Sequence, residues 1–518
     1  MRTAQIHIRI VDCSEPFSID IGLIYFCTNL SLLDFRKRLK VILLHRRFVV
    51  AALSACTLFI TLGCWALSSP KTSDTDAGYH IGSIWCGWGE KQGICEYPTV
   101  LVGLEDFEVL IPSMNPKNPA IPEMQPSRSA LPAQQSAYYK IMRVFVSKNS
   151  TQSVLLMRLF NSLLASVVFF FLLYLTRSRV RQAVVGSWTF TIVPTLISTL
   201  PQLNPRSWAS LGVMSSWAFL HSGLSAESND GSRRKLSFVF FGITCLLAIC
   251  TRWDATLFVT FTSCVIVLGH LVKKQLLHWK HFLLVSFVSV IGYFSVITFV
   301  PRSAYFLKVE FPPLYSKQQF ILFMFVHIPE NIFNAVGLGY RQDDLGPGII
   351  GIIGTSLLVL SIAFVMHNAS KIQTSIFILY SLMIFFAMFH VLDFGMQPPP
   401  GLYIAALLTA FLGTLFLNKR HDQALMLTNT QRRSIISVLS FAHLLSLHAK
   451  FEHSVLGGFY MGTYEKLSLN GGWWWNTPIS PNVVFVIGVS SFVLWLILSW
   501  MTIGQSTSNP ALGAHSHS

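Results

Sequence analysis

Long apolar runs alternate with short polar or basic turns along the chain. The runs are close to the roughly 20 residues that an α-helix needs to cross a bilayer, and this pattern predicts spans at residues 48–69, 154–175, 183–200, 208–224, 236–250, 255–272, 282–300, 349–366, 372–392, 402–417, 434–447 and 483–501. The sequence therefore predicts an all-α polytopic membrane protein with about 11–13 transmembrane helices.

Clusters of Lys and Arg indicate how the spans are oriented. They occupy residues 36–47, 177–181, 233–235, 273–280 and 419–433. Because positive charge marks cytoplasmic turns, both termini are expected in the cytoplasm. We expect an N-terminal cytoplasmic extension, a transmembrane domain and a disordered cytoplasmic tail, at residues 1–47, 48–503 and 504–518.

Three longer polar segments then fall on the external side, at residues 70–152, 301–347 and 448–481. The first contains an amphipathic stretch at 137–146, which is expected to lie along the membrane surface. The second contains an apolar run at 320–336 that carries several polar groups, among them His327 and Glu330. Such groups are costly against lipid, so this run is expected to form a re-entrant or surface helix.

Composition supports a membrane protein and argues against a nucleic-acid partner. Hydrophobic residues make up 52% of the chain and charged residues only 12%. The net charge of +15 is spread over the basic turns instead of forming one continuous patch. Of the nine cysteines, Cys86 and Cys95 form a close pair in the first external loop, which predicts a disulfide, with two free thiols as the alternative.

The first external loop also contains the strongest candidates for acid–base chemistry. Asp74, Asp76 and His80 follow directly after the first apolar run. A partly desolvated Asp76 would have a raised pKa, which suits a general base, whereas the alternative is that both aspartates are solvated loop acids. A divalent metal stays open as a cofactor, although so few ligands do not specify one and no zinc motif is present.

A second group of polar residues gathers at the external ends of later spans. Arg252 and Asp254 lie in a very short turn, TRWD, where Arg252 either binds a phosphate bidentately or forms a local ion pair with Asp254. Aromatic residues near this surface form either an interfacial belt or a stacking surface for sugar rings. The remaining candidates are Asn204, Arg206, Tyr340, Arg341, Asp343, Asp344 and Trp474.

Several motifs together carry a resemblance to a known class. In order along the chain they are DAGYH (76–80), NPRSW (204–208), TRWD (251–254), GYRQDDLGP (339–347) and QPPPGLY (397–403). With about a dozen spans and a long first external loop, the chain resembles the GT-C polytopic glycosyltransferases. More narrowly, residues 45 to 505 resemble a bacterial domain-of-unknown-function family of membrane proteins that is similar to GT-C enzymes. The chain departs from that family at Ala77, where a second carboxylate is usual, and in QPPPGLY, which lacks an arginine.

The resemblance implies a function at the external face of a bacterial plasma membrane. A sugar would pass from a polyprenyl-phosphate-linked donor to an envelope glycan, lipid or protein acceptor. Asp76 would act as the base, assisted by Asp74 or His80. The other implied roles are donor-phosphate binding by Arg252, Arg206 and Arg341, and substrate binding by Asn204, Asp254, Tyr340, Asp343, Asp344 and Trp474. The alternatives are a transporter or flippase of lipid-linked saccharides, and a non-catalytic partner in envelope assembly.

Overall fold

The computed structural model describes eleven stretches of the chain. They are residues 32–68, 80–81, 84–85, 137–147, 149–225, 231–272, 348–367, 369–393, 400–418, 427–456 and 479–504. Every regular element within these residues is a helix, which confirms the predicted all-α class. The described residues from Arg47 onwards form one compact unit.

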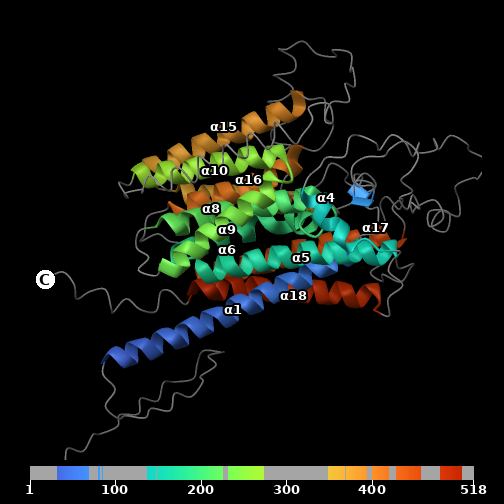
Figure 1. Ribbon diagram of the computed structural model, residues 1–518, viewed down its shortest axis with the longest axis horizontal. Coiled ribbons are helices and arrows are strands. Elements are labelled where there is room, and N and C mark those ends of the chain that lie inside the picture. Colours follow the sequence, from blue (N-terminus) through green and yellow to red (C-terminus); the bar gives the residue numbers. More distant parts are fainter. Residues whose placement is uncertain are drawn as a thin grey trace, which may run out of the picture. The chain divides into compact units, whose positions relative to one another are not determined.

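The helices follow the predicted order along the chain (Figure 1). They are α1 (Leu32–Ser68), α4 (Ala137–Met142), η2 (Arg143–Phe145), α5 (Ser150–Leu175), α6 (Ser178–Thr191), η3 (Ile192–Leu196), α7 (Ile197–Thr199), α8 (Pro205–Leu224), α9 (Gly231–Ile249), α10 (Trp253–Val272), α14 (Gly348–Met366), α15 (Lys371–Asp393), α16 (Pro400–Leu417), α17 (Asn429–Leu456) and α18 (Pro481–Gly504). The predicted segments at 282–300 and 320–336 lie outside the described residues.

Within the described residues, five helices are long and apolar enough to cross a membrane. Their apolar parts are Arg47–Ser68, Thr151–Leu175, Asp254–Val272, Asn429–Phe451 and Pro481–Ile503. Shorter apolar helices run over Ile352–Met366, Lys371–Ala387 and Ile404–Leu417. The protein is therefore an all-α polytopic membrane protein.

Two helix starts are fixed by asparagine side chains. The side chain of Asn149 accepts a hydrogen bond from the backbone N–H of Gln152 at 3.1 Å and caps α5. Asn204 Oδ1 accepts from the backbone N–H of Arg206 at 2.9 Å, and Pro205 occupies the first position of α8. Asparagine satisfies a backbone donor that the first turn leaves open, and proline has no such donor to lose. The NPR sequence therefore sets the point where α8 begins.

Glycines let neighbouring helices approach closely. A Cβ added at Gly212 in α8 would lie 2.5 Å from the carbonyl oxygen of Thr244 in α9. A Cβ added at Gly413 in α16 would lie 2.2 Å from the ring of Trp217 in α8. Small residues at helix contacts are typical of membrane bundles, because packing replaces the hydrophobic driving force there. These contacts place α9 and α16 directly against α8.

Polar side chains form direct links between helices inside the apolar bundle. The hydroxyls of Thr191 and Thr409 are 2.7 Å apart and join α6 to α16. Trp65 in α1 donates its indole N–H to Nε2 of His443 in α17 at 3.0 Å. In a low-dielectric interior, a buried polar group is tolerated when it has such a partner.

Some predicted helix limits were wrong. The segment expected to form one span at 183–200 is interrupted, because α6 ends at Thr191 and Val193 has extended dihedral angles (φ −98°, ψ 139°). Pro194 excludes the helical conformation from the residue before it, which explains the break. At α17 the helix continues to Leu456, beyond the end expected at residue 447. Polar residues such as Lys450 end the hydrophobic run, but they do not end the helix.

Candidate functional site

An ion pair lies at the turn between α9 and α10. Arg252 Nε donates to Asp254 Oδ1 at 2.9 Å, and Arg252 Nη2 donates to Asp254 Oδ2 at 3.2 Å. Asp254 Oδ1 also accepts the backbone N–H of Ala255 at 2.9 Å, at the start of α10. Of the two alternatives for the TRWD turn, the local ion pair is present.

This ion pair is well shielded from solvent. The side chains of Arg252 and Asp254 are only 13% and 9% exposed. A bidentate geometry holds the guanidinium in a fixed plane, which a single hydrogen bond would not achieve. The turn therefore presents a pre-oriented arginine with part of its charge balanced by a neighbouring carboxylate.

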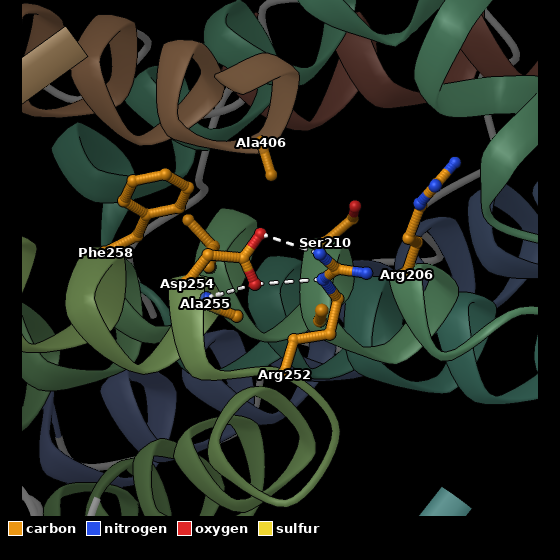
Figure 2. A pocket seen from close by; sticks show the side chains of 9 residues that line it. Arg206, Ser210, Arg252, Asp254, Ala255, Phe258 and Ala406 are labelled. Atoms are coloured by element: carbon orange, nitrogen blue, oxygen red, sulfur yellow. Dashed lines mark hydrogen bonds and ion pairs between the residues drawn. The ribbon is translucent and has the colours of Figure 1, made fainter. Parts of the chain in front are cut away.

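The ion pair forms one wall of a small pocket of about 20 Å³. In Figure 2, Phe258 lies on one side of the pair and Arg206 on the other. The pocket is lined by Arg206, Ala209, Ser210, Val213, Arg252, Asp254, Ala255, Phe258 and Ala406, from α8, the α9–α10 turn, α10 and α16. Among the described lining residues, two arginines and one aspartate give a net positive charge, which favours an anion.

A polar and aromatic cluster supports the start of α8 beside this pocket. Trp208 donates its indole N–H to Asn161 Oδ1 at 2.8 Å, and Asn161 Nδ2 donates to the carbonyl oxygen of Gln202 at 2.6 Å. The rings of Tyr138 and Trp208 meet edge to face with centroids 5.1 Å apart. Asn161, in α5, is only 1% exposed. The cluster holds the chain just before Arg206 in place.

Asn161 and Tyr138 are not among the residues that the sequence predicts for the site. Asn161 is an amide inside an otherwise apolar run, and an uncharged polar residue in such a run is a signal for a helix–helix or site contact. Tyr138 lies in α4, and α4 with η2 covers the stretch predicted as a surface helix.

His80 is joined to the same region. Its Nδ1 lies 2.8 Å from the hydroxyl of Tyr139, and its side chain is buried at 7% exposure. The backbone N–H of Ala137, at the start of α4, donates to the carbonyl oxygen of Cys250 at 3.2 Å. Through α4, His80 is therefore connected to the turn that carries Arg252.

The described residues include only part of the predicted site. His80, Arg206, Arg252 and Asp254 lie around α4, the start of α8 and the α9–α10 turn, and Asn204 caps α8 as described above. No group of three or more metal-ligating side chains occurs among the described residues. The candidates outside the described residues are Asp74, Asp76, Tyr340, Arg341, Asp343, Asp344 and Trp474, together with Cys86 and Cys95 of the predicted disulfide.

Comparison with known proteins identifies one family. A family model described as Predicted membrane protein (DUF2142) matches residues 58–333, which is more than half of the chain. The match includes α5 to α10 and so contains the described pocket except for Ala406. No curated protein and no solved structure matches the chain.

Proposed function

Since the chain belongs to this family of predicted membrane proteins, we propose that it is a membrane glycosyltransferase of GT-C type. It would transfer a sugar from a polyprenyl-phosphate-linked donor to an envelope glycan, lipid or protein acceptor on the external face of the membrane. The observation that supports this proposal most directly is the pocket with Arg206 and the Arg252–Asp254 pair at one end of the helix bundle.

The chemistry of a lipid-linked donor matches this kind of pocket. The polyprenyl chain keeps the donor phosphate within the bilayer, so its binding site has to open between helices at headgroup depth. Arg252 and Arg206 supply guanidinium groups, which bind phosphate in a planar, bidentate manner. The pocket is also bordered by the start of α8, where the positive end of the helix dipole favours an anion.

Asp254 has a positioning role in this proposal. By holding Arg252 in one orientation, it fixes where the donor phosphate binds before the substrate arrives. Phe258 and Val213 provide an apolar wall for the first part of the prenyl chain. Asp76 would be the base that takes the acceptor's proton, and His80 would assist at the same surface.

The test compares lipid-linked sugars and envelope glycans in cells that carry the wild-type chain or a variant at matched expression. Asp76→Asn, Arg206→Gln and Arg252→Gln should each cause the donor to accumulate and one glycan to be lost. Lys371→Gln is the matched control, because Lys371 is an exposed cation at the start of α15. If the deletion changes the profile and the three site variants do not, the glycosyltransferase assignment is wrong.

One observation supports transport of a lipid-linked saccharide as a second candidate. The interruption between α6 and α7 lies in a fully buried segment, and broken helices are typical of transporter binding sites. In this case the variants would block appearance of the lipid-linked sugar on the external leaflet, and glycosyl transfer by the purified protein would be absent. Assaying both in proteoliposomes separates the two functions.

A further inference from the structure

A second cluster of arginines lies at the opposite end of the bundle from the pocket. It consists of Arg47 in α1, Arg181 in the first turn of α6 and Arg233 in the first turn of α9. Helix α9 has 19 residues and leads from Arg233 to the turn that carries Arg252. At 1.5 Å per residue its length is about 28 Å, close to the thickness of the hydrocarbon core. The two arginine clusters therefore correspond to the two membrane surfaces.

Tyr174 at the end of α5 brings the parts of this cluster together. The guanidinium carbon of Arg233 lies 5.6 Å from the centroid of the Tyr174 ring. Phe48, the neighbour of Arg47, meets the same ring edge to face at 5.9 Å. Helix α6 begins four residues after Tyr174, at Ser178, and reaches Arg181 within its first turn. Helix α1 and the beginning of α9 thus contact one aromatic ring, and α6 begins shortly after it in the chain.

Arg181 is the most deeply placed cation of the cluster. It is only 4% exposed, and its Nε atom has no hydrogen-bond partner. Burial, together with the nearby positive charges of Arg47 and Arg233, lowers the pKa of Arg181 to about 10. Within the described residues no carboxylate pairs with Arg181. A buried guanidinium beside two like charges is unfavourable unless an anion compensates it.

We propose that Arg47, Arg181 and Arg233 bind a phosphate group, supplied by the headgroup of an anionic phospholipid or by free phosphate. The starts of α6 and α9 add the positive ends of two helix dipoles at the same place. The binding site is distinct from the pocket at Arg252, and it does not depend on the proposed glycosyl transfer.

The exposed apolar surface of α9 that follows Arg233 favours the lipid as the source of the phosphate. Leu236, Val239 and Ile243 follow Arg233 along α9 at helical spacing, and all three are exposed. A phospholipid with its phosphate at the arginines would place an acyl chain along this apolar stripe. Free phosphate would gain nothing from the stripe.

Two acidic residues near the cluster in sequence offer another way to compensate the charge. Glu227 and Asp230 precede α9 and lie outside the described residues. If their carboxylates neutralised the arginines, no external anion would be needed. The full-length wild-type protein would then bind anionic and zwitterionic lipid equally, which is an outcome of the experiment below.

The experiment measures lipid bound to the purified full-length protein by native mass spectrometry, after reconstitution with phosphatidylglycerol or phosphatidylcholine. Wild type should retain phosphatidylglycerol selectively. Arg181→Gln should weaken that retention by about tenfold, the effect of losing one charge-assisted hydrogen bond. Lys235→Gln is the matched control, because it removes an exposed cation from the same turn of α9 and should leave retention unchanged.

A second measurement follows thermal unfolding in detergent with and without each anion. Without any anion, Arg181→Gln should be at least as stable as wild type, because it removes a buried charge that lies near two like charges. Stabilisation by inorganic phosphate alone, with displacement of phosphatidylglycerol, would identify free phosphate as the ligand. The proposal would be overturned if wild type bound both lipids equally and phosphate had no effect. Equal losses of lipid retention in Arg181→Gln and Lys235→Gln would also overturn it.

Discussion

The contact between α8 and α9 at Gly212 gives a sharp test of the fold that positions the pocket. An added Cβ at Gly212 would lie 2.5 Å from the carbonyl oxygen of Thr244, and 2.8 Å and 2.9 Å from the Cβ and backbone nitrogen of Ala248. Two of these three atoms belong to the backbone of α9. No rotation of a flexible side chain can therefore relieve the clash, and Gly212→Ala has to push the two helices apart.

The expected cost follows from two opposing effects. Overpacking of a well-packed interior typically costs about 1–3 kcal/mol. Replacing a helical glycine by alanine gains roughly 0.5–1 kcal/mol from lower backbone entropy in the unfolded chain. Because the clash involves backbone, the cost should exceed the gain, leaving a net destabilisation of about 1–2 kcal/mol.

The assay is unfolding of the purified protein in mixed micelles, with Gly242→Ala as the matched control. Gly242 lies in α9 and has no atom within 4 Å of its added Cβ, so alanine should be neutral or slightly stabilising there. If Gly212→Ala and Gly242→Ala have the same free energy of unfolding, the close approach of α8 and α9 is not a feature of the protein.

Three further predictions concern buried polar groups. Asn161→Leu removes the acceptor of an indole N–H and should destabilise the protein by about 1–3 kcal/mol, measured by the same unfolding assay. His443→Phe keeps the ring but leaves the indole N–H of Trp65 without its acceptor, so a loss of about 1–2 kcal/mol is expected, and Trp65→Phe in addition should restore most of it. Asp254→Asn removes the charge of the carboxylate that pairs with the guanidinium of Arg252 and should cost about 2–4 kcal/mol, again measured by unfolding.

The helices were predictable from the sequence because their apolar runs match the lipid bilayer that surrounds them. A run such as that of α5 has to be helical in a bilayer, since no other local structure satisfies its backbone there. Helix limits were less predictable. The break before Pro194 depends on local dihedral angles, and the extension of α17 places polar residues on a helix that hydrophobicity alone would end at residue 447.

The site was only partly predictable for a different reason. The TRWD sequence indicated that Arg252 and Asp254 are close, but the spacing alone does not determine whether their side chains pair. Asn161 illustrates the opposite case, since it lies far in sequence from Trp208 and only the packing of α5 on α8 brings them together. Long-range partners of this kind are not contained in local patterns.

Whether the Arg252–Asp254 pair serves the turn or a ligand can be decided by removing both charges at once. A buried ion pair adds little net stability, and replacement of both partners by apolar residues is often close to neutral, whereas loss of one partner is costly. The double variant Arg252→Leu/Asp254→Leu should therefore have a free energy of unfolding within about 1 kcal/mol of the wild-type value. This free energy should be well above that of Asp254→Asn. Cells that carry this double variant should nevertheless lose the envelope glycan, because no guanidinium remains at that wall of the pocket. A stable double variant with a normal glycan profile would mean that the pair only closes the turn, and the donor phosphate would have to bind elsewhere.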